Sequence, residues 1–407
     1  MKELEEYLNS KIGLTNNKNL HVLGRFFTDS QLNNLMNKTI SIVGTNGKTS
    51  TANFVYQLLS NDILNVLMFT SPHLVNFSER IQSNTEINFD YLTKTVQDFE
   101  SENNITLGYF ETLFLIACKA FLDNEMDYFI CEAGIGGILD TTSVIQSKNV
   151  VLTNIGRDHQ ELLGDTDLKV LEQKIFVSDN IDNLFVGDLS DELVKVIENS
   201  YKHCKSKFFL KDFVDSESKK IYLTANQVNY VLASITVKSI LNLKNKEISY
   251  DFVNTLVEGR FEIINRNPLK ILDGAHNIDG FIKTLEDYEK EYVDSILNTV
   301  GKPERDIRIV LDCGNAVPGP LAVKTLEELG IDVIPLYCDW DNSFPNHPPD
   351  PTRPKNMVDL GEAVVKHGAE FGIGMDGDGD RLGVVDEKGS FIHPDRLMGI
   401  FVKDVLE

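Results

Sequence analysis

The chain has 407 residues, of which 42% are hydrophobic and 25% are charged, and its formal net charge is −23. This length predicts about two or three globular domains, and the negative charge argues against a general nucleic-acid or anionic-membrane surface. The five cysteines form no CxxC pair, which predicts buried thiols in a reducing compartment. The acidic, amphipathic start of the chain is not a signal peptide and no apolar run approaches membrane length, so we expect a cytoplasmic protein.

Composition changes along the chain. Only Pro72 and Pro268 precede residue 300, whereas the other ten of the twelve prolines follow it. Such a shift is typical of a domain boundary or of a join between segments of different origin.

The first informative stretch is TISIVGTNGKTSTANFVYQLL, residues 39–59. Ile40–Val43 is predicted as a buried strand, Gly44–Gly47 as a tight turn, and Lys48 as the start of a helix. Backbone N–H groups at a helix N-terminus attract an anion, Lys48 adds a full charge, and Thr49 or Ser50 can reach a magnesium ion. The pattern predicts an ATP site, and a chance Gly-Lys-Thr after a strand is the alternative.

The next predicted strand, Val66–Thr70, ends in the polar run SPHLVNFSERI. This run is either a surface loop or a loop that brings Ser71 to a metal and His73 or Arg80 to a substrate. An apolar helix is predicted over Leu107–Leu122.

Two further strands end in candidate metal ligands. Glu132 follows the predicted strand Tyr128–Cys131, and His159 follows Val150–Thr153. Because open parallel sheets bind ligands at the carboxyl ends of their strands, Glu132 is well placed for Mg²⁺. A lone histidine is often structural, so both a structural and a metal-binding role stay open for His159.

Several segments carry a family resemblance. They are GTNGKTS (44–50), SPHLVNFSERI (71–81), YFET (109–112), EAGIGGILDTT (132–142), TNIGRDHQELLGDT (153–166), GRFEII (259–264) and DGAHN (273–277). Together they make residues 1 to about 290 similar to folylpolyglutamate synthase/dihydrofolate synthase, a Mur-ligase-like ATP-dependent amide ligase. The resemblance implies a P-loop three-layer α/β/α ATPase domain over residues 1–258, followed by the start of a truncated C-terminal domain over 259–290.

The resemblance also implies the chemistry. ATP phosphorylates a folate or dihydropteroate carboxylate, and the amine of L-glutamate attacks the acyl phosphate. Residue by residue it implies phosphate binding by Gly44, Thr45, Asn46, Gly47, Lys48, Thr49 and Ser50, nucleotide contact by Arg260, and magnesium ligation by Ser71, Glu132 and His159. It further implies that Lys174 is a carbamylated lysine holding a second metal, and that Asp273 and His276 form an interdomain pair with a catalytic role.

The chain departs from the family pattern at several positions. Ile138 replaces an arginine, Gln173 a glutamate, Thr49 a glycine, Arg157 an apolar residue and Ile278 a proline. After the D-x-x-H-N loop a different sequence takes over. We therefore expect Mg-ATP binding but weak glutamate ligation.

The C-terminal part is predicted as a small α/β unit. The predicted strands are Arg308–Leu311, Asp332–Leu336, Phe371–Met375 and Leu382–Asp386, and the predicted helices are Leu321–Leu329, a segment around Met357–His367, and the last residues.

Its chemistry lies in DGDGDR, residues 376–381. The carboxylates of Asp376, Asp378 and Asp380 alternate with glycines that permit a sharp turn, a pattern that favours one hard cation. An EF-hand has acidic residues at similar spacing, but Arg381 stands where its glycine belongs and the preceding segment reads as a strand. A solvated acidic turn without metal is a second alternative.

This part also carries a resemblance. IVLDCGNAVPGP, FPNHPPDPTRPKN and GIGMDGDGDRLGVVDEKG make residues 291–407 similar to the second domain of a phosphoglucomutase/phosphomannomutase. The resemblance implies that Asp376, Asp378 and Asp380 bind Mg²⁺, with Arg381 near a sugar phosphate. No Thr-Ala-Ser-His-Asn-Pro serine loop is present in the sequence, so we expect no mutase turnover.

The sequence thus predicts a chimera with three candidate functions. The first is a folate-class ATP-dependent ligase, whose activity is expected to be impaired. The second is a phosphohexomutase-type isomerase fragment that binds Mg²⁺ and sugar phosphate. The third is a non-catalytic chimera that binds Mg-nucleotide.

Overall fold

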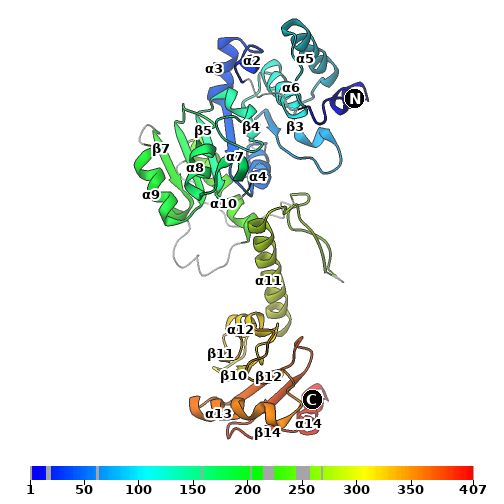
Figure 1. Cartoon of the computed structure of the whole chain (residues 1–407), viewed down its shortest axis with the longest axis vertical. Helices are drawn as coiled ribbons and strands as arrows, with labels where there is room; N and C mark the ends of the chain where they lie inside the picture. Colours follow the sequence, from blue (N-terminus) through cyan, green and yellow to red (C-terminus); the bar gives the residue numbers. More distant parts are fainter. Residues whose placement is uncertain are drawn as a thin grey trace. The chain divides into compact units, whose positions relative to one another are not determined.

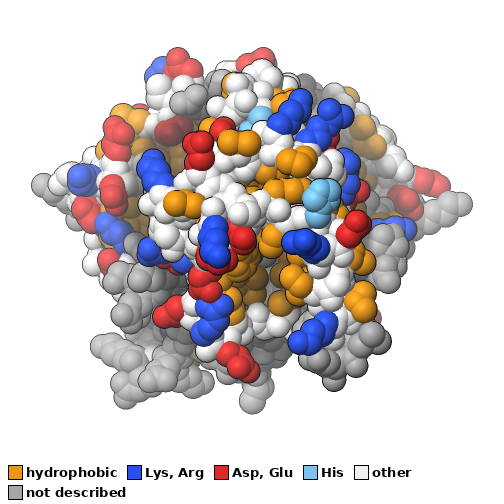
Figure 2. Space-filling model, turned by 90° about the horizontal axis from the view of Figure 1, so that it is seen from below, with side chains coloured by type: hydrophobic (Ala, Val, Ile, Leu, Met, Phe, Trp, Pro, Cys, Tyr) orange, Lys and Arg blue, Asp and Glu red, His pale blue; other side chains and the backbone are white. Residues whose placement is uncertain are grey.

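The computed structural model describes residues 2–14, 20–60, 64–156, 158, 160–201, 204–213, 224–243, 257–266 and 269–406. The chain divides into two compact units, Met1–Asp287 (unit 1) and Tyr288–Glu407 (unit 2) (Figure 1). Within the described residues, no helix has the length and hydropathy needed to cross a membrane. Figure 2 shows a face on which acidic and basic side chains are interspersed and hydrophobic side chains are exposed between them.

Unit 1 is built on a seven-stranded sheet of order β3-β2-β4-β1-β5-β6-β7. All neighbouring strands are parallel except β2 and β3, which are antiparallel. The strands are β1 (Thr39–Val43), β2 (Val66–Phe69), β3 (Ile81–Ser83), β4 (Tyr128–Glu132), β5 (Asn149–Asn154), β6 (Asn183–Asp188) and β7 (Ser206–Phe209).

Helices cover both faces of this sheet. They are α1 (Lys2–Asn9), α2 (Leu20–Gly24), α3 (Asp29–Lys38), α4 (Lys48–Ser60), α5 (Phe89–Asn103), α6 (Tyr109–Asp123), α7 (Gln160–Leu163), α8 (Asp167–Ile175), α9 (Asp191–Ser200) and α10 (Ala225–Ile240). Successive strand residues point to opposite faces, and here both faces are apolar. Met68 and Ile130 pack in the core under α4 and α10, whereas Phe69 and Phe129 pack in the core under α5 and α6. Unit 1 is therefore the predicted three-layer α/β/α domain.

The ends of some elements differ from the sequence expectation. The helix predicted from Leu107 begins at Tyr109, because the Leu107 N–H donates to Glu100 Oε1 (2.6 Å) and Gly108 takes the extended N-cap conformation. The helix predicted around Met357 begins at Val358, since the residues before it form a short 3₁₀ turn, Pro354–Met357.

A hairpin of β8 (Glu262–Arg266) and β9 (Leu269–Leu272) precedes helix α11 (Ile278–Val300). Neither glycine nor proline occurs between Gly280 and Gly301, so nothing in the sequence interrupts this helix. It continues through residue 290, where the sequence predicts the join, and the division between the compact units falls within it, after Asp287.

Unit 2 contains a five-stranded sheet of order β11-β10-β12-β13-β14. Its strands are β10 (Arg308–Asp312), β11 (Asp332–Leu336), β12 (Phe371–Met375), β13 (Leu382–Val385) and β14 (Phe391–Ile392), and its helices are α12 (Gly319–Glu328), α13 (Val358–His367) and α14 (Pro394–Leu406). The short strand β14 is missing from the sequence prediction. Strands β12 and β13 pair antiparallel up to Met375↔Leu382, so residues 376–381 form the connection of a hairpin. An EF-hand, which needs flanking helices, is thereby excluded.

Candidate functional site

A cavity of about 260 Å³ opens in unit 1 at the carboxyl ends of the central strands. Its lining comes from the loop before α4, the ends of β2 and β4, the start of α10, the segment 273–276, and α11 as far as Asp287. Most of the residues that the sequence predicts for phosphate, metal or catalytic roles in unit 1 line it. Gly44, Ile138 and the substrate candidates His73 and Arg80 are not among the lining residues, and Arg80 Nε donates to His73 Nδ1 at 2.8 Å. His159, like Arg157, lies outside the described residues.

The loop between β1 and α4 has a conformation that requires glycine. Gly44 has φ +145°, and a Cβ there would lie 1.9 Å from Thr153 Oγ1. The Thr45 and Asn46 N–H groups donate to the Asn154 backbone and side-chain oxygens at 3.0 and 2.8 Å. The N–H groups in the first turn of α4 have no acceptor inside the helix, and these are the donors left for an anion.

Two lysines approach this loop from different helices, of which Lys174 is buried and Lys48 is partly buried. Lys48 Nζ donates to the Gly44 and Thr45 carbonyls at 3.1 and 2.9 Å, and Lys174 Nζ donates to the Gly44 and Ile135 carbonyls at 2.9 and 3.0 Å. Burial lowers the pKa of both amines. The pKa of Lys174 falls to about 7, because burial and then the charge of Lys48 disfavour its protonated form. Near neutral pH a large fraction of Lys174 is therefore an uncharged amine, capable of acting as a nucleophile.

Glu132 ends β4 inside the cavity with 1% of its surface exposed. Its carboxylate accepts from Thr49 Oγ1 at 3.0 Å and from the Ser71 N–H at 3.1 Å, and burial raises its pKa. A buried carboxylate without a cationic hydrogen-bond donor in the described residues is a fitting oxygen ligand for Mg²⁺. Ser71 and Glu132 are therefore neighbours, and their binding of a shared metal stays a prediction.

Thr49 acquires a role that the sequence does not suggest. Its hydroxyl accepts from Arg260 Nη2 at 3.3 Å and donates to Glu132. The departure from the family glycine therefore links the acidic and basic sides of the cavity.

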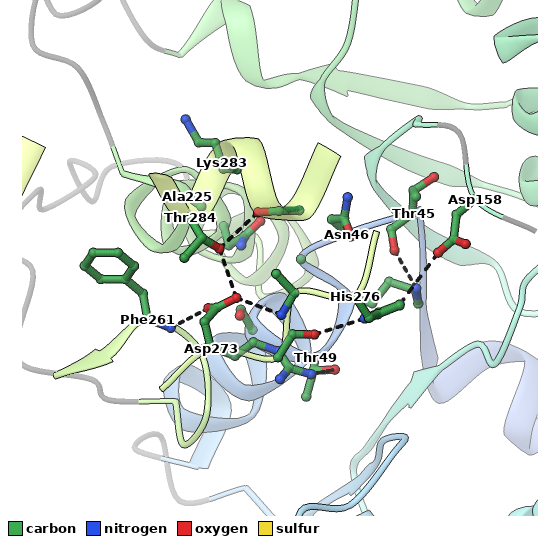
Figure 3. Close-up of a pocket in the computed structure, with 18 of the residues that line it drawn as sticks. Thr45, Asn46, Thr49, Asp158, Ala225, Phe261, Asp273, His276, Lys283 and Thr284 are labelled. Carbon is green, nitrogen blue, oxygen red and sulfur yellow. Dashed lines mark hydrogen bonds and ion pairs between the residues drawn. The ribbon is translucent and has the colours of Figure 1, made fainter. Parts of the chain in front are cut away.

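The segment after β9 closes the cavity (Figure 3). Asp273 accepts from the N–H groups of Phe261 (2.6 Å) and Ala275 (2.8 Å) and from Thr284 Oγ1 (3.0 Å). His276 is more exposed, and its Nε2 lies 3.6 Å from Asp158 Oδ2. Asp273 is thus fixed by its neighbours, whereas His276 faces the opening of the site.

Two further residues of the cavity, Asn229 and Asp287, are not predicted from the sequence. Asn229 lies against the phosphate loop, where its Oδ1 would be 2.6 Å from a Cβ on Gly47. Asp287 accepts the Ala225 N–H at 3.0 Å, and burial raises its pKa to about 6. On an amphipathic helix, a buried acidic residue such as Asp287 has the same sequence signal as an acidic residue that faces solvent.

The second predicted cluster lies in unit 2. One carboxylate oxygen from each of Asp376, Asp378 and Asp380 lies within 4.8 Å of the others. Arg381 Nη2 contacts Asp376 Oδ2 at 2.7 Å, and its Nε lies 3.3 Å from Asp380 Oδ1. Arg381 thus supplies one positive charge to a cluster of three carboxylates, through Asp376 and Asp380. Its position near a phosphate stays a prediction.

Comparison with known proteins shows the family to which unit 1 is similar. The family model for the Mur ligase middle domain matches residues 42–266, more than half of the chain. The chain belongs to the Mur ligase family. A dihydrofolate synthase/folylpolyglutamate synthase of Buchnera aphidicola is 29% identical over 318 residues, which cover 73% of each chain. A solved complex of folylpolyglutamate synthase (FPGS) with AMPPCP and folate covers 83% of this chain and 88% of its own, with a TM-score of 0.58 and 22% identity, and so shares the fold.

Unit 2 of this Mur ligase-family chain matches another family. The model for phosphoglucomutase/phosphomannomutase, alpha/beta/alpha domain II, matches residues 290–389. The phosphomannomutase/phosphoglucomutase of Pseudomonas aeruginosa is 42% identical over 153 residues, which are 38% of this chain. The chain spans only 31% of the length of that relative. It therefore joins a Mur ligase part to one domain of a phosphohexomutase.

Proposed function

We propose that unit 1 is the catalytic part of an ATP-dependent amide ligase that adds L-glutamate to folate or dihydropteroate. The observation that carries the proposal is the convergence of a phosphate loop, two lysines and a buried carboxylate on one cavity. The kinship with dihydrofolate synthase/folylpolyglutamate synthase over most of both chains supports the substrate class.

In the proposed reaction a substrate carboxylate oxygen attacks the γ-phosphorus of ATP and ADP leaves. The glutamate nitrogen then attacks the acyl carbon, loses a proton, and phosphate leaves. The free N–H groups at the start of α4 and the Lys48 ammonium neutralise charge on the phosphates. Glu132 and Ser71 would hold Mg²⁺, which supplies further charge neutralisation.

Lys174 has a separate proposed role. Its amine can form a carbamate with CO₂ only when it is deprotonated, and its pKa of about 7 makes that form abundant at neutral pH. The carbamate would replace a buried cation by an oxygen ligand beside the loop. We propose that Arg260 contacts the nucleotide, and that Asp273 and His276 form the interdomain pair with a catalytic role.

The proposed ligase is impaired, because the segment that follows the D-x-x-H-N loop belongs to a different family. Unit 2 offers a metal-binding hairpin where the family resemblance implies the rest of a C-terminal ligase domain. Ile138, which stands in place of an arginine, leaves 46% of its surface exposed, so its substitution removes a charge without leaving a buried partner unsatisfied.

The test is glutamate-dependent ADP release by the full chain with dihydropteroate or tetrahydrofolate. We expect slow turnover that Lys48→Ala abolishes together with nucleotide binding, whereas Lys195→Ala, which changes an exposed lysine on α9, has no effect. Unchanged ATP affinity in Lys48→Ala would overturn the phosphate site. ATP binding without ADP release would favour the non-catalytic Mg-nucleotide-binding function.

The aspartate hairpin supports a second candidate, a phosphohexomutase-type fragment that binds Mg²⁺ and a sugar phosphate. We expect Mg²⁺ binding without isomerisation, since no serine loop of the mutase type is present in the sequence. A glucose-1-phosphate mutase assay on the same preparation tests this, and measurable turnover would contradict it.

A further inference from the structure

The side-chain amide of Asn277 joins three segments of unit 1. Its Nδ2 donates to Asn46 Oδ1 and to Asp158 Oδ2, both at 3.0 Å. Its Oδ1 accepts from Asn46 Nδ2 at 3.2 Å and from the Gly280 N–H at 2.8 Å. A primary amide has two N–H donors and two acceptor lone pairs, so the hydrogen-bonding capacity of Asn277 is filled.

These four hydrogen bonds make three connections in the fold. The Gly280 bond caps the N-terminus of α11, since Asn277 directly precedes the helix and its oxygen accepts an N–H of the first turn. The reciprocal pair with Asn46 crosses 231 positions of sequence to the phosphate loop. The Asp158 bond reaches the segment after β5. Asparagine is required, because aspartate would lose both donors and place a second negative charge beside Asp158.

Helix α11 also lines the cavity, and Asp287 lies nine residues along the helix from Ile278, roughly 14 Å from the start of the helix. Lys283, Thr284 and Asp287 are among the lining residues, and Asp287 is bound to the first residue of α10 through the Ala225 N–H. The helix is therefore fixed at Asp287 to α10 and at Asn277 to the phosphate loop. Thr284 adds a hydrogen bond to Asp273, and the Asn277 connection is the one that ties the start of the helix to the phosphate loop.

We infer that Asn277 is a positioning residue, which sets the part of the cavity lined by α11 relative to the phosphate loop so that both ends of one nucleotide are held together. The inference rests on the proposed ATP site and deepens it. Asn277 touches no phosphate-binding donor, because the free N–H groups lie in the first turn of α4. Loss of the Asn277 side chain should therefore weaken the binding of a ligand that spans the cavity. The binding of a ligand that occupies the loop alone should change little.

The experiment compares binding of ATP and of inorganic tripolyphosphate to the full chain by calorimetry. For Asn277→Ala we expect about tenfold weaker ATP binding and less than about twofold change for tripolyphosphate. Asn46→Ala should weaken ATP binding by a similar factor, and the double variant should lose about tenfold and not a hundredfold in ATP affinity, because both variants remove one shared connection. Asn298→Ala, at an exposed position of the same helix, is the matched control and should bind as the wild type does.

Equal weakening of both ligands, unchanged ATP affinity, or additive losses in the double variant would each overturn the inference. If Asn277→Ala does not fold, Asn277→Ser, which keeps an oxygen to cap α11 but lacks the amide donors, carries the same comparison. If the wild type binds neither ligand, the proposed function fails. The coupling between Asn46 and Asn277 is then measured from the unfolding free energies of the wild type, the two single variants and the double variant. Additive losses of stability would overturn the hydrogen-bonded connection between Asn46 and Asn277.

Discussion

Units 1 and 2 both gather charged side chains at strand ends, but they stabilise those charges in different ways. In unit 1 Lys48, Lys174 and Glu132 come from three separate elements and have pKa values shifted toward their neutral forms. Lys174 and Glu132 are buried and Lys48 is partly buried. In unit 2 the aspartates come from one hairpin, Asp378 and Asp380 are exposed or partly so, and Arg381 supplies the counter-charge.

The difference teaches how each site is prepared for a ligand. Burial in unit 1 disfavours the charged forms of these groups. A bound phosphate or cation would stabilise the charged forms, so ligand binding and ionisation favour each other. The hairpin in unit 2 is already neutralised in part, so a cation there competes with Arg381. The predictions below test this contrast, from the largest expected effect to the smallest.

The sharpest contrast is between two carboxylates. Glu132→Gln should lower glutamate-dependent ADP release by about a hundredfold or more, because it removes the buried negative oxygen proposed to hold Mg²⁺. Asp378→Asn in the hairpin should leave this activity unchanged. A comparable loss in both variants, measured with the coupled ADP assay, would break the distinction between the sites.

Lys174 should make the stability of unit 1 depend on pH. Its folded pKa of about 7 lies below the usual 10.5, so between these values the unfolded state binds more protons and the free energy of unfolding rises with pH. That contribution is lost as pH falls through 7. Lys174→Met should reduce the slope by about 1.4 kcal/mol per pH unit between pH 7.5 and 9.5.

The measurement for Lys174→Met is chemical denaturation followed by circular dichroism. Lys195→Met, at an exposed site, is the control and should keep the wild-type slope. An unchanged slope in Lys174→Met would mean that the amine is solvated or carbamylated in the folded protein.

Arg381 should compete with a divalent cation. Arg381→Gln removes the partner of the buried Asp376 carboxylate, so unit 2 should melt roughly 5 °C lower without Mg²⁺. Added Mg²⁺ should restore more stability to the variant than to the wild type. Amide hydrogen exchange in β12 and β13 measures this, and equal responses to Mg²⁺ would argue for an acidic turn that binds no metal.

The smallest expected effect is at Gly379 in the hairpin, whose φ is +79°. Gly379→Ala should lower the stability of unit 2 by about 1 kcal/mol, since alanine is strained there and its Cβ would lie 3.1 Å from Pro318 Cβ. Gly379→Asn, which tolerates positive φ better, should cost less. Equal losses, seen by thermal melting, would point to crowding rather than backbone strain.

Local features of both units could be predicted from sequence. The strand-turn-helix around Gly44–Lys48 and the hairpin at Asp376–Arg381 each follow from residues that are neighbours in the chain. The ends of helices were predicted less well, because Leu107 and Met357 have the hydrophobicity of helix positions while Gly108 and a 3₁₀ turn decide where the helices begin.

The sequence by itself determined the phosphate loop and the aspartate hairpin, since each depends on apolar strand residues and turn residues within a short segment. The three-layer architecture of unit 1 was implied by the family resemblance, and its strands β3, β6 and β7 were not predicted. Only the tertiary structure decided that Thr49 connects Glu132 with Arg260 and that Asn277 fills its amide against Asn46 and Asp158. Such contacts join residues far apart in sequence, and their geometry depends on how helices and sheet pack, which leaves no periodic trace in the chain.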